Sequence, residues 1–135
     1  ALRAYHIRTP EPLAMIEQRA GPVRRRAWFI TRVAEGISAA EFFSGGEVSA
    51  FTQDMRRLAD LVLAFGENEL VHGDMKAANF MLSSRGVQVI DLDSMRQDAR
   101  PAEIAEDRRR FLANWQEDKN LQQLFAELLG SLTPG

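Results

Sequence analysis

The chain has 135 residues, of which 45% are hydrophobic and 27% are charged, and its net charge is −2. This is the composition of a soluble globular protein, and the length fits one domain with a hydrophobic core. No apolar run approaches the roughly 20 residues that a membrane-spanning helix needs. The chain contains no cysteine, which excludes disulfides and thiolate chemistry, and its overall charge gives no indication of nucleic-acid binding.

The first part of the chain contains two apolar-rich runs. Residues 12–19 and 26–33 favour strands, and the Gly-Pro pair between them is typical of a turn, so we expect a hairpin. The arginines at 24–26 lie in or beside this turn. A solvated turn is the first explanation for them, and contact with anionic sugar phosphates or a lipid surface is the alternative. We expect residues 34–46 to form a connector with a short helical turn.

An amphipathic helix is the clearest predicted element. From Glu47 onward the apolar residues recur at spacings of four and three, which places them on one face of a helix. We expect Gly66 to end this helix in the left-handed conformation that glycine often adopts at helix ends. The apolar stripe consists of Phe51, Met55, Leu58, Val62 and Phe65.

Paired strands and two further helices complete the predicted fold. Residues 79–83 and 87–92 favour strands, and the Ser-Arg-Gly turn between them joins the pair. Pro101 suits the first turn of a helix that continues towards Trp115. A last amphipathic segment begins with Asn120 as its cap and stops at Gly130. Because strands and helices do not alternate regularly, the predicted class is α+β.

Residues 72–79 carry chemistry suited to phosphoryl transfer. That reaction needs a carboxylate to orient and deprotonate the attacking hydroxyl, and a cation to stabilise the charge on the transferred group. Asp74 fits the first requirement and Lys76 the second. Asn79 and Asp91 would supply the oxygen ligands that Mg²⁺ prefers. The two strands between them form a predicted hairpin, which would bring both residues to the same rim.

His72, Asp74, Lys76 and Asn79 resemble the catalytic loop of protein-kinase-like phosphotransferases, whose signature is H-R-D-L-x-x-x-N followed by D-F-G. Gly73 replaces the arginine of many protein kinases, and Asp-Leu-Asp at 91–93 replaces D-F-G. The His-Gly-Asp form is typical of small-molecule kinases such as aminoglycoside and choline phosphotransferases. Over residues 7–115 the chain looks most similar to the bacterial lipopolysaccharide core kinases, the heptose and Kdo kinase family.

This resemblance implies a protein-kinase-like fold in two parts. Residues 1–36 would be the hinge-side strands of the N-lobe with the hinge itself. Residues 37–135 would be a minimal, mainly helical C-lobe that carries the catalytic loop and a β-hairpin. No Gly-rich phosphate loop and no strand lysine stand before the hinge strands, so we expect this chain to be a piece of a longer kinase and incomplete as a catalyst alone.

The resemblance also implies further site residues. In the hinge, Ile30 would be the gatekeeper, and the Thr31 carbonyl and the Val33 N–H would face adenine. Met81 would form the floor of the nucleotide pocket. Two residues would support the catalytic loop: His72 by packing and hydrogen bonding within it, and Asp107 by bonding its backbone from a neighbouring helix.

The expected function is ATP- and Mg²⁺-dependent phosphorylation of a sugar hydroxyl, on heptose or Kdo of the lipopolysaccharide inner core. The partners would be the nucleotide and the saccharide, without nucleic acid, and the enzyme would work at the cytoplasmic face of the inner membrane with peripheral contact. Two alternatives stay open. One is another small-molecule kinase of the aminoglycoside or choline type, and the other is a pseudokinase that serves as a binding module.

Overall fold

The computed structural model describes residues 7–10, 12–20, 23–31, 34–45 and 48–130. Two small antiparallel sheets and four α-helices make an α+β fold, as predicted. The elements are β1 (Pro12–Ala20), β2 (Val23–Thr31), β3 (Ile37–Ser38), α1 (Ala39–Phe42), α2 (Gln53–Glu67), the 3-10 helix η2 (Ala77–Asn79), β4 (Phe80–Ser83), β5 (Gly86–Val89), α3 (Pro101–Ala113) and α4 (Lys119–Leu128).

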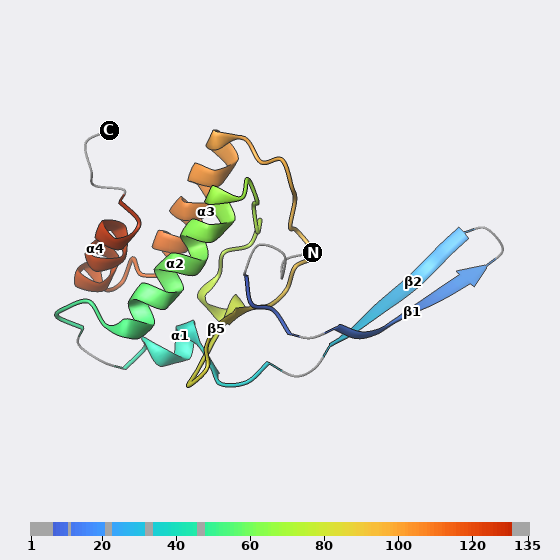
Figure 1. Cartoon of the computed structure of the whole chain (residues 1–135), viewed down its shortest axis with the longest axis horizontal. Helices are drawn as coiled ribbons and strands as arrows, with labels where there is room; N and C mark the ends of the chain where they lie inside the picture. The colour runs from blue at the N-terminus through green and yellow to red at the C-terminus, as the bar shows by residue number, and fades with distance from the viewer. Residues whose placement is uncertain (1–6, 11, 21–22, 32–33, 46–47, 131–135) are drawn as a thin grey trace.

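Strands β1 and β2 form the predicted hairpin, and Figure 1 shows that it extends away from the helical body. The pairing is antiparallel, with Met15 opposite Phe29. Strand β2 begins at Val23, three residues before the predicted start, because the Gly-Pro pair alone separates the strands. All three arginines therefore lie within β2, where Arg24 is paired in register with Arg19 and Arg26 with Gln18.

The second sheet has the order β3-β4-β5, and its two-residue strand β3 was not predicted. Strands β4 and β5 form the predicted hairpin, although β5 ends at Val89 rather than at residue 92. The Val89 N–H also donates to the Arg8 carbonyl at 2.9 Å, so the N-terminal segment lies along the free edge of β5. Gly36 precedes β3 at a φ of 98°, and a Cβ there would lie 1.8 Å from the Leu82 carbonyl oxygen. Only glycine therefore fits this close approach to β4.

Helix α2 buries Met55, Leu58, Val62 and Phe65 of the predicted apolar stripe, but it begins after Phe51 and does not end at Gly66. The Thr52 hydroxyl caps the N-terminus by accepting from the Met55 N–H, which leaves Phe51 outside the helix and 37% exposed. Gly66 lies inside the helix, where a Cβ would stand 2.9 Å from the Ile104 side chain of α3. Its missing side chain therefore allows close packing of two helices, and Glu69 takes the left-handed conformation after the helix.

Helices α3 and α4 follow the predicted order with one wrong cap. Pro101 occupies the first turn of α3 as expected. Helix α4 begins at Lys119, and the Asp118 carboxylate caps it by accepting from the Leu121 N–H at 3.1 Å. The predicted cap Asn120 is wrong because the helix starts before it. The helix stops before Gly130, which has a φ of 71°.

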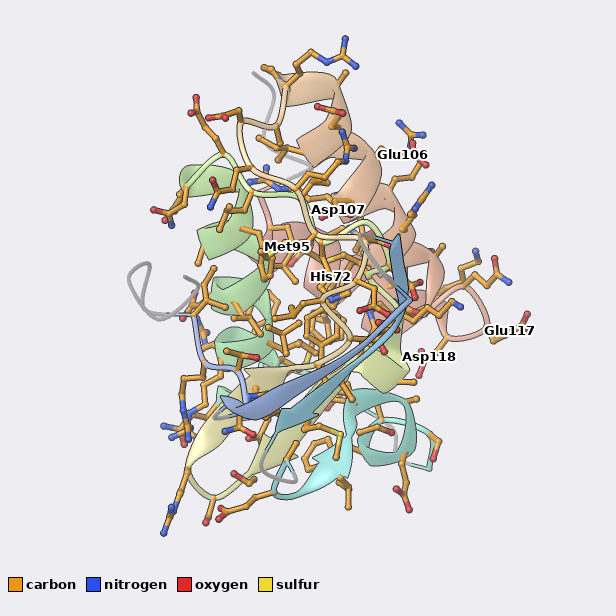
Figure 2. All side chains as sticks on the ribbon, turned by 90° about the vertical axis from the view of Figure 1, so that its right-hand side faces the viewer. His72, Met95, Glu106, Asp107, Glu117 and Asp118 are labelled. Carbon is orange, nitrogen blue, oxygen red and sulfur yellow. The ribbon has the colours of Figure 1, made fainter. Side chains whose placement is uncertain are left out.

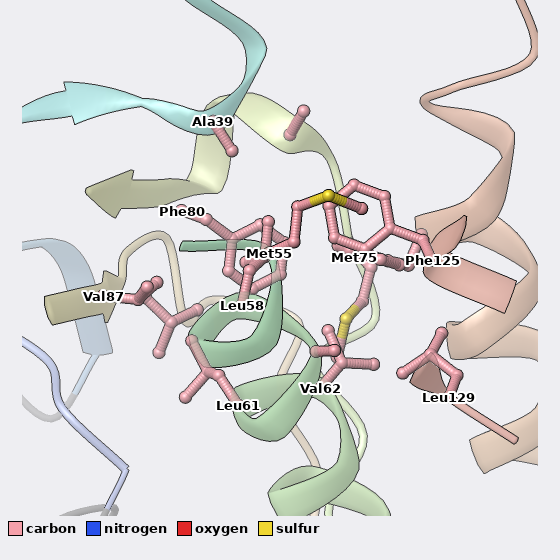
Figure 3. Close-up of a cluster of buried hydrophobic side chains, with 14 of the residues drawn as sticks. Ala39, Met55, Leu58, Leu61, Val62, Met75, Phe80, Val87, Phe125 and Leu129 are labelled. Carbon is pink, nitrogen blue, oxygen red and sulfur yellow. The ribbon is translucent and has the colours of Figure 1, made fainter. Parts of the chain in front are cut away.

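The hydrophobic core lies between α2, the β4–β5 hairpin and the two C-terminal helices. Figure 3 shows side chains from α2 meeting those of the hairpin and of α4. Ile7, which falls in the first of the two expected parts, is 1% exposed and belongs to this same core. Among the residues described, no helix combines the length and the apolar character needed to cross a membrane.

The N-terminus of α3 carries a pH-sensitive contact, and it gives a first prediction. Hydrogen bonds from the Arg100 N–H and the Arg96 guanidinium lower the pKa of Glu103 from 4.5 to about 2. A lowered carboxyl pKa contributes stability above the unfolded value, and that stability is lost as pH falls. Glu103→Gln should therefore flatten the loss of stability between about pH 4.5 and 2. Urea midpoints measured across this range check it.

The exposed Glu117 offers the matched control for this experiment. Glu117→Gln removes one carboxylate from a site outside α3. The loss of stability with falling pH should then be as steep as in the unmodified protein. Equal slopes for the two variants would show that Glu103 does not govern the acid response.

Candidate active site

From Asp74 to Asn79, buried side chains alternate with more exposed ones, and Val71 and His72 before them are both buried. His72, Met75 and Ala77 are buried, and Figure 3 shows Met75 reaching into the core beside Val62. The Asp74 and Lys76 side chains are 31% and 72% exposed. The apolar residues therefore anchor the loop, and this anchoring presents the proposed catalytic pair to solvent.

His72 lies in the interior and bonds at both ring nitrogens. Its Nε2 is 3.0 Å from the Ile90 carbonyl oxygen, and its Nδ1 accepts from the Asp74 N–H at 3.1 Å. A carbonyl can only accept, so the proton belongs on Nε2 and the ring is neutral. The ring is 0% exposed and packs edge-on against Phe65. This environment suits a residue that supports the loop and does not transfer protons.

Asp107 reaches the loop from α3, and Figure 2 shows it beside His72. Its carboxylate accepts from the His72 N–H at 2.7 Å and from the Gly73 N–H at 3.1 Å. These are the backbone bonds that the family resemblance implied. Burial raises the pKa of Asp107, and the two N–H bonds oppose that shift. The carboxylate is thus buried at a cost that its hydrogen bonds partly offset.

Gly73 adopts a conformation that only glycine accommodates easily. Its φ is 84°, and a Cβ would lie 2.7 Å from the Ser94 carbonyl oxygen. A larger side chain would meet the backbone of the segment after β5, which cannot move as freely as a side chain. The arginine found here in many protein kinases therefore has no room in this loop.

The four predicted chemical residues gather at one end of the β4–β5 hairpin. The Lys76 Nζ is 3.7 Å from the Asp74 carboxylate. The Asn79 amide donates to the Asp74 carbonyl at 2.9 Å and lies 3.4 Å from its carboxylate. The Ile90 N–H donates to the Asn79 carbonyl at 2.8 Å, which places the next residue, Asp91, beside this group. Asp91 is exposed, with a left-handed φ of 56°, two residues beyond the end of β5.

Asn79 and Asp91 carry the kinds of oxygen atom that nucleotide-bound Mg²⁺ takes as ligands. Within the described part of the chain, no three His, Cys, Asp or Glu side chains form a metal cluster. Nucleotide-bound Mg²⁺ usually takes one or two protein ligands, together with phosphate and water oxygens. The Asn79 amide nitrogen makes the bonds to Asp74, so the side-chain oxygen is the atom that would bind a metal. The donor set therefore fits a metal whose remaining ligands come with the substrate.

The predicted nucleotide residues lie on two different sheets. Thr31 is the last residue of β2 and pairs with Pro12, and Ile30 precedes it in the same strand. Met81 lies in β4 opposite Gln88 and is half-buried. Val33 lies outside the described residues. The adenine contacts assigned to these residues stay predictions.

A cleft of about 580 Å³ opens beside Lys76. Its walls come from α1 and the following residues, from the start of η2, and from the segment between α3 and α4. The lining includes Phe43, Lys76, Asn114, Glu117 and Asp118. This volume falls within the range of small-molecule sites, and the polar groups on its walls can bind hydroxyls.

Two contacts to the loop were not predicted. One comes from Arg110 within α3, and the other from Asn114, the residue just after the helix. The Arg110 guanidinium donates to the Gly73 carbonyl at 2.6 Å. The Asn114 side chain bonds the backbone of Met75 and Ala77. A signal was present, because residues 107, 110 and 114 have the spacing of one helical face. Arginine side chains on a helix surface usually face water, so this spacing alone did not single out Arg110.

The loop before the β4–β5 hairpin carries an aspartate, a lysine and an asparagine, and another aspartate follows the hairpin. A third aspartate, on a helix, supports the loop. Together these features define the protein-kinase-like class of phosphotransferases. The model of the lipopolysaccharide kinase (Kdo/WaaP) family matches residues 1–128, and the chain belongs to this family. No curated protein matches the chain.

The fold is also that of a solved structure. The structure described as "WaaP in complex with acyl carrier protein" is similar at a TM-score of 0.66 and 19% sequence identity. The match covers 96% of this chain and 62% of the WaaP chain, so this chain spans less than two thirds of that protein. At this identity the likeness shows the protein-kinase-like fold.

Proposed function

We propose that this protein transfers the γ-phosphoryl group of ATP to a sugar hydroxyl of the lipopolysaccharide inner core, on heptose or Kdo. Membership of the lipopolysaccharide kinase family supports the reaction class. The observation that carries the proposal is the arrangement around Asp74: its carboxylate faces solvent beside Lys76, while buried neighbours hold its backbone.

Each residue has a separate part in the proposed mechanism. Asp74 orients the acceptor hydroxyl and takes its proton as the oxygen attacks the γ-phosphorus and the bond to ADP breaks. Lys76 stabilises the negative charge on the transferred oxygens. Asn79 and Asp91 would hold Mg²⁺, which when bound neutralises phosphate charge. Thr31, Val33 and Met81 would bind adenine, the first two through backbone groups.

We place the acceptor sugar in the cleft beside Lys76. Carboxylates accept hydrogen bonds from sugar hydroxyls, and Glu117 and Asp118 provide two at the cleft wall. Lys76 lines the same cleft and lies 3.7 Å from the Asp74 carboxylate, so a hydroxyl at the edge of the cleft would reach the proposed base. Anionic groups of the core or the membrane surface would meet the arginines of β2, which gives peripheral contact at the cytoplasmic face of the inner membrane.

Transfer of labelled phosphate from ATP to a panel of acceptors tests this function. Inner-core saccharides containing heptose and Kdo should be labelled, and aminoglycosides and choline should not. Labelling of aminoglycosides or choline alone would indicate a small-molecule kinase of the aminoglycoside or choline type. Nucleotide binding without any transfer would identify the pseudokinase alternative.

The metal assignment gives a second prediction. Asp91→Asn should remove most of the gain in ATP affinity that Mg²⁺ provides, because an amide is a weaker ligand than a carboxylate for this hard cation. Calorimetric titration of ATP with and without Mg²⁺ measures this gain. Asp93→Asn is the control, since Asp93 is an exposed carboxylate two residues away. Equal Mg²⁺ dependence in the two variants would contradict the assignment.

A further inference from the structure

Three side chains on one face of α3 and at its C-terminal end bind the backbone of the proposed catalytic loop. Asp107, Arg110 and Asn114 are separated by three and four positions, which aligns them on one side of the helix. Each directs a side chain to loop peptide groups that belong to residues 72–77. Asp107 was expected from the family resemblance, whereas the other two contacts were not.

Arg110 fixes the peptide group that leads into Asp74. This group consists of the Gly73 carbonyl and the Asp74 N–H. The carbonyl accepts from Arg110 at 2.6 Å, and the N–H donates to His72 at 3.1 Å. Both ends of one rigid plane are therefore held, and the plane sets the direction in which the Asp74 side chain leaves the backbone. The restraint matters because glycine has little conformational preference of its own.

Glu106 holds Arg110 in place for this contact. The Arg110 Nε lies 3.4 Å from the Glu106 carboxylate, one helical turn earlier on α3. Arg109 also pairs with Glu106, yet no hydrogen bond joins Arg109 to the loop within the described residues. The two neighbouring arginines thus share a partner and differ in the loop contact, which makes them a natural pair for comparison.

Asn114 fixes the two peptide groups on either side of Lys76. Its amide nitrogen donates to the Met75 carbonyl at 2.8 Å, and its oxygen accepts from the Ala77 N–H at 3.0 Å. The same amide nitrogen caps α3 by donating to the Phe111 carbonyl at 2.8 Å. One side chain therefore joins the end of α3 to the loop, and both of its polar atoms are used.

We propose that Arg110 and Asn114 are positioning residues of the phosphotransferase, with Arg110 setting the orientation of Asp74 and Asn114 that of Lys76. The inference rests on the proposed function. Neither residue is assigned a contact with the reacting atoms. Asn114 also lines the acceptor cleft, but its amide nitrogen and oxygen are both bonded to backbone groups, so both residues act through the loop backbone. Loss of either contact should lower kcat more than it weakens nucleotide binding, since small displacements of catalytic groups cost rate.

Arg110 variants test the first half of this proposal. Arg110→Met should lower kcat by about 10- to 100-fold and change the KM for ATP by less than about threefold. Arg110→Lys should recover part of the rate, because an ammonium can still donate to the Gly73 carbonyl. Arg109→Met is the matched control and should retain the full rate. Equal kcat for the Arg110→Met and Arg109→Met variants would overturn the role of Arg110.

Asn114 variants test the second half. Asn114→Asp keeps the size and can still accept from the Ala77 N–H, but its ionised carboxylate cannot donate to the Met75 carbonyl. Its rate relative to the unmodified protein should be reduced about 10-fold or more at neutral pH and should rise as pH falls, because the acid form regains a donor. A relative rate that does not depend on pH would overturn the role of this donor.

Hydrogen exchange separates this inference from the proposed function. Amide exchange of residues 73–77 should be faster in Arg110→Met and in Asn114→Leu than in Arg109→Met, at equal global stability. If the unmodified protein transfers no phosphate, the proposed function fails, and faster exchange still supports the control of the loop by α3. Unchanged exchange in both variants would overturn the inference whatever the activity.

Discussion

Replacing Asp74 by asparagine should lower kcat by about 10²- to 10⁴-fold, which is the usual contribution of a general base. The amide keeps the size of the side chain and can still lie beside Lys76 and Asn79, so the loop should keep its structure. It cannot accept the proton of the acceptor hydroxyl. Because Asp74 is not assigned a contact with the nucleotide, ATP affinity should change by less than about threefold. Steady-state rates and ATP titration measure the two effects.

Asp60→Asn provides the control for this experiment. Asp60 is exposed on α2 and lies outside the loop, so the same chemical change there should leave kcat unaltered. Asp74→Ala should match the asparagine variant in rate. If the Asp74→Asn variant kept more than about half of the original rate, Asp74 would not be the base, because losing a general base costs far more.

The largest effect on stability should come from Phe111→Ala, at about 3–5 kcal/mol. The Phe111 ring is 0% exposed and lies 5.2 Å from the Phe125 ring and 5.8 Å from the Phe80 ring. Its removal leaves a cavity where α3, α4 and the β4–β5 hairpin meet. Small domains have only about 5–15 kcal/mol in total, so this variant should unfold at much lower urea concentration.

Phe51→Ala is the matched control for the core variant. Phe51 is 37% exposed just before α2, and its ring faces the Arg56 guanidinium at 5.2 Å. Its removal should cost about 1 kcal/mol or less, since little buried surface is lost. Similar urea midpoints for the two alanine variants would contradict the central place given to Phe111.

Elements with a long repeating pattern could be predicted from the sequence. The stripe of α2 and the two hairpins follow from their spacing and turn residues, and the structure confirms them. Strand β3 has two residues, which is too short to carry a period. The role of Gly66 depends on the approach of α3, and no local pattern reports the distance between two helices.

The site divides in the same way between local and distant contacts. Asp74, Lys76 and Asn79 lie within one loop, so their spacing along the chain is enough to indicate a common site. Arg110 and Asn114 bind backbone atoms more than thirty positions earlier in the chain. Backbone atoms are the same for every residue type, and such contacts therefore leave little trace in the sequence. The shared face of these two residues gains its meaning only from the position of α3 beside the loop.

The chain enters and leaves the β1–β2 hairpin at opposite edges of one sheet. Arg8 lies along the edge of β5, whereas β3 lies along the edge of β4. Three strand spacings, or about 14 Å, separate these two edges. A linker replacing the hairpin would need about five extended residues to bridge that gap. A shorter bridge would draw the two sheet edges together, and any replacement of the hairpin would also remove Thr31, to which an adenine contact is assigned.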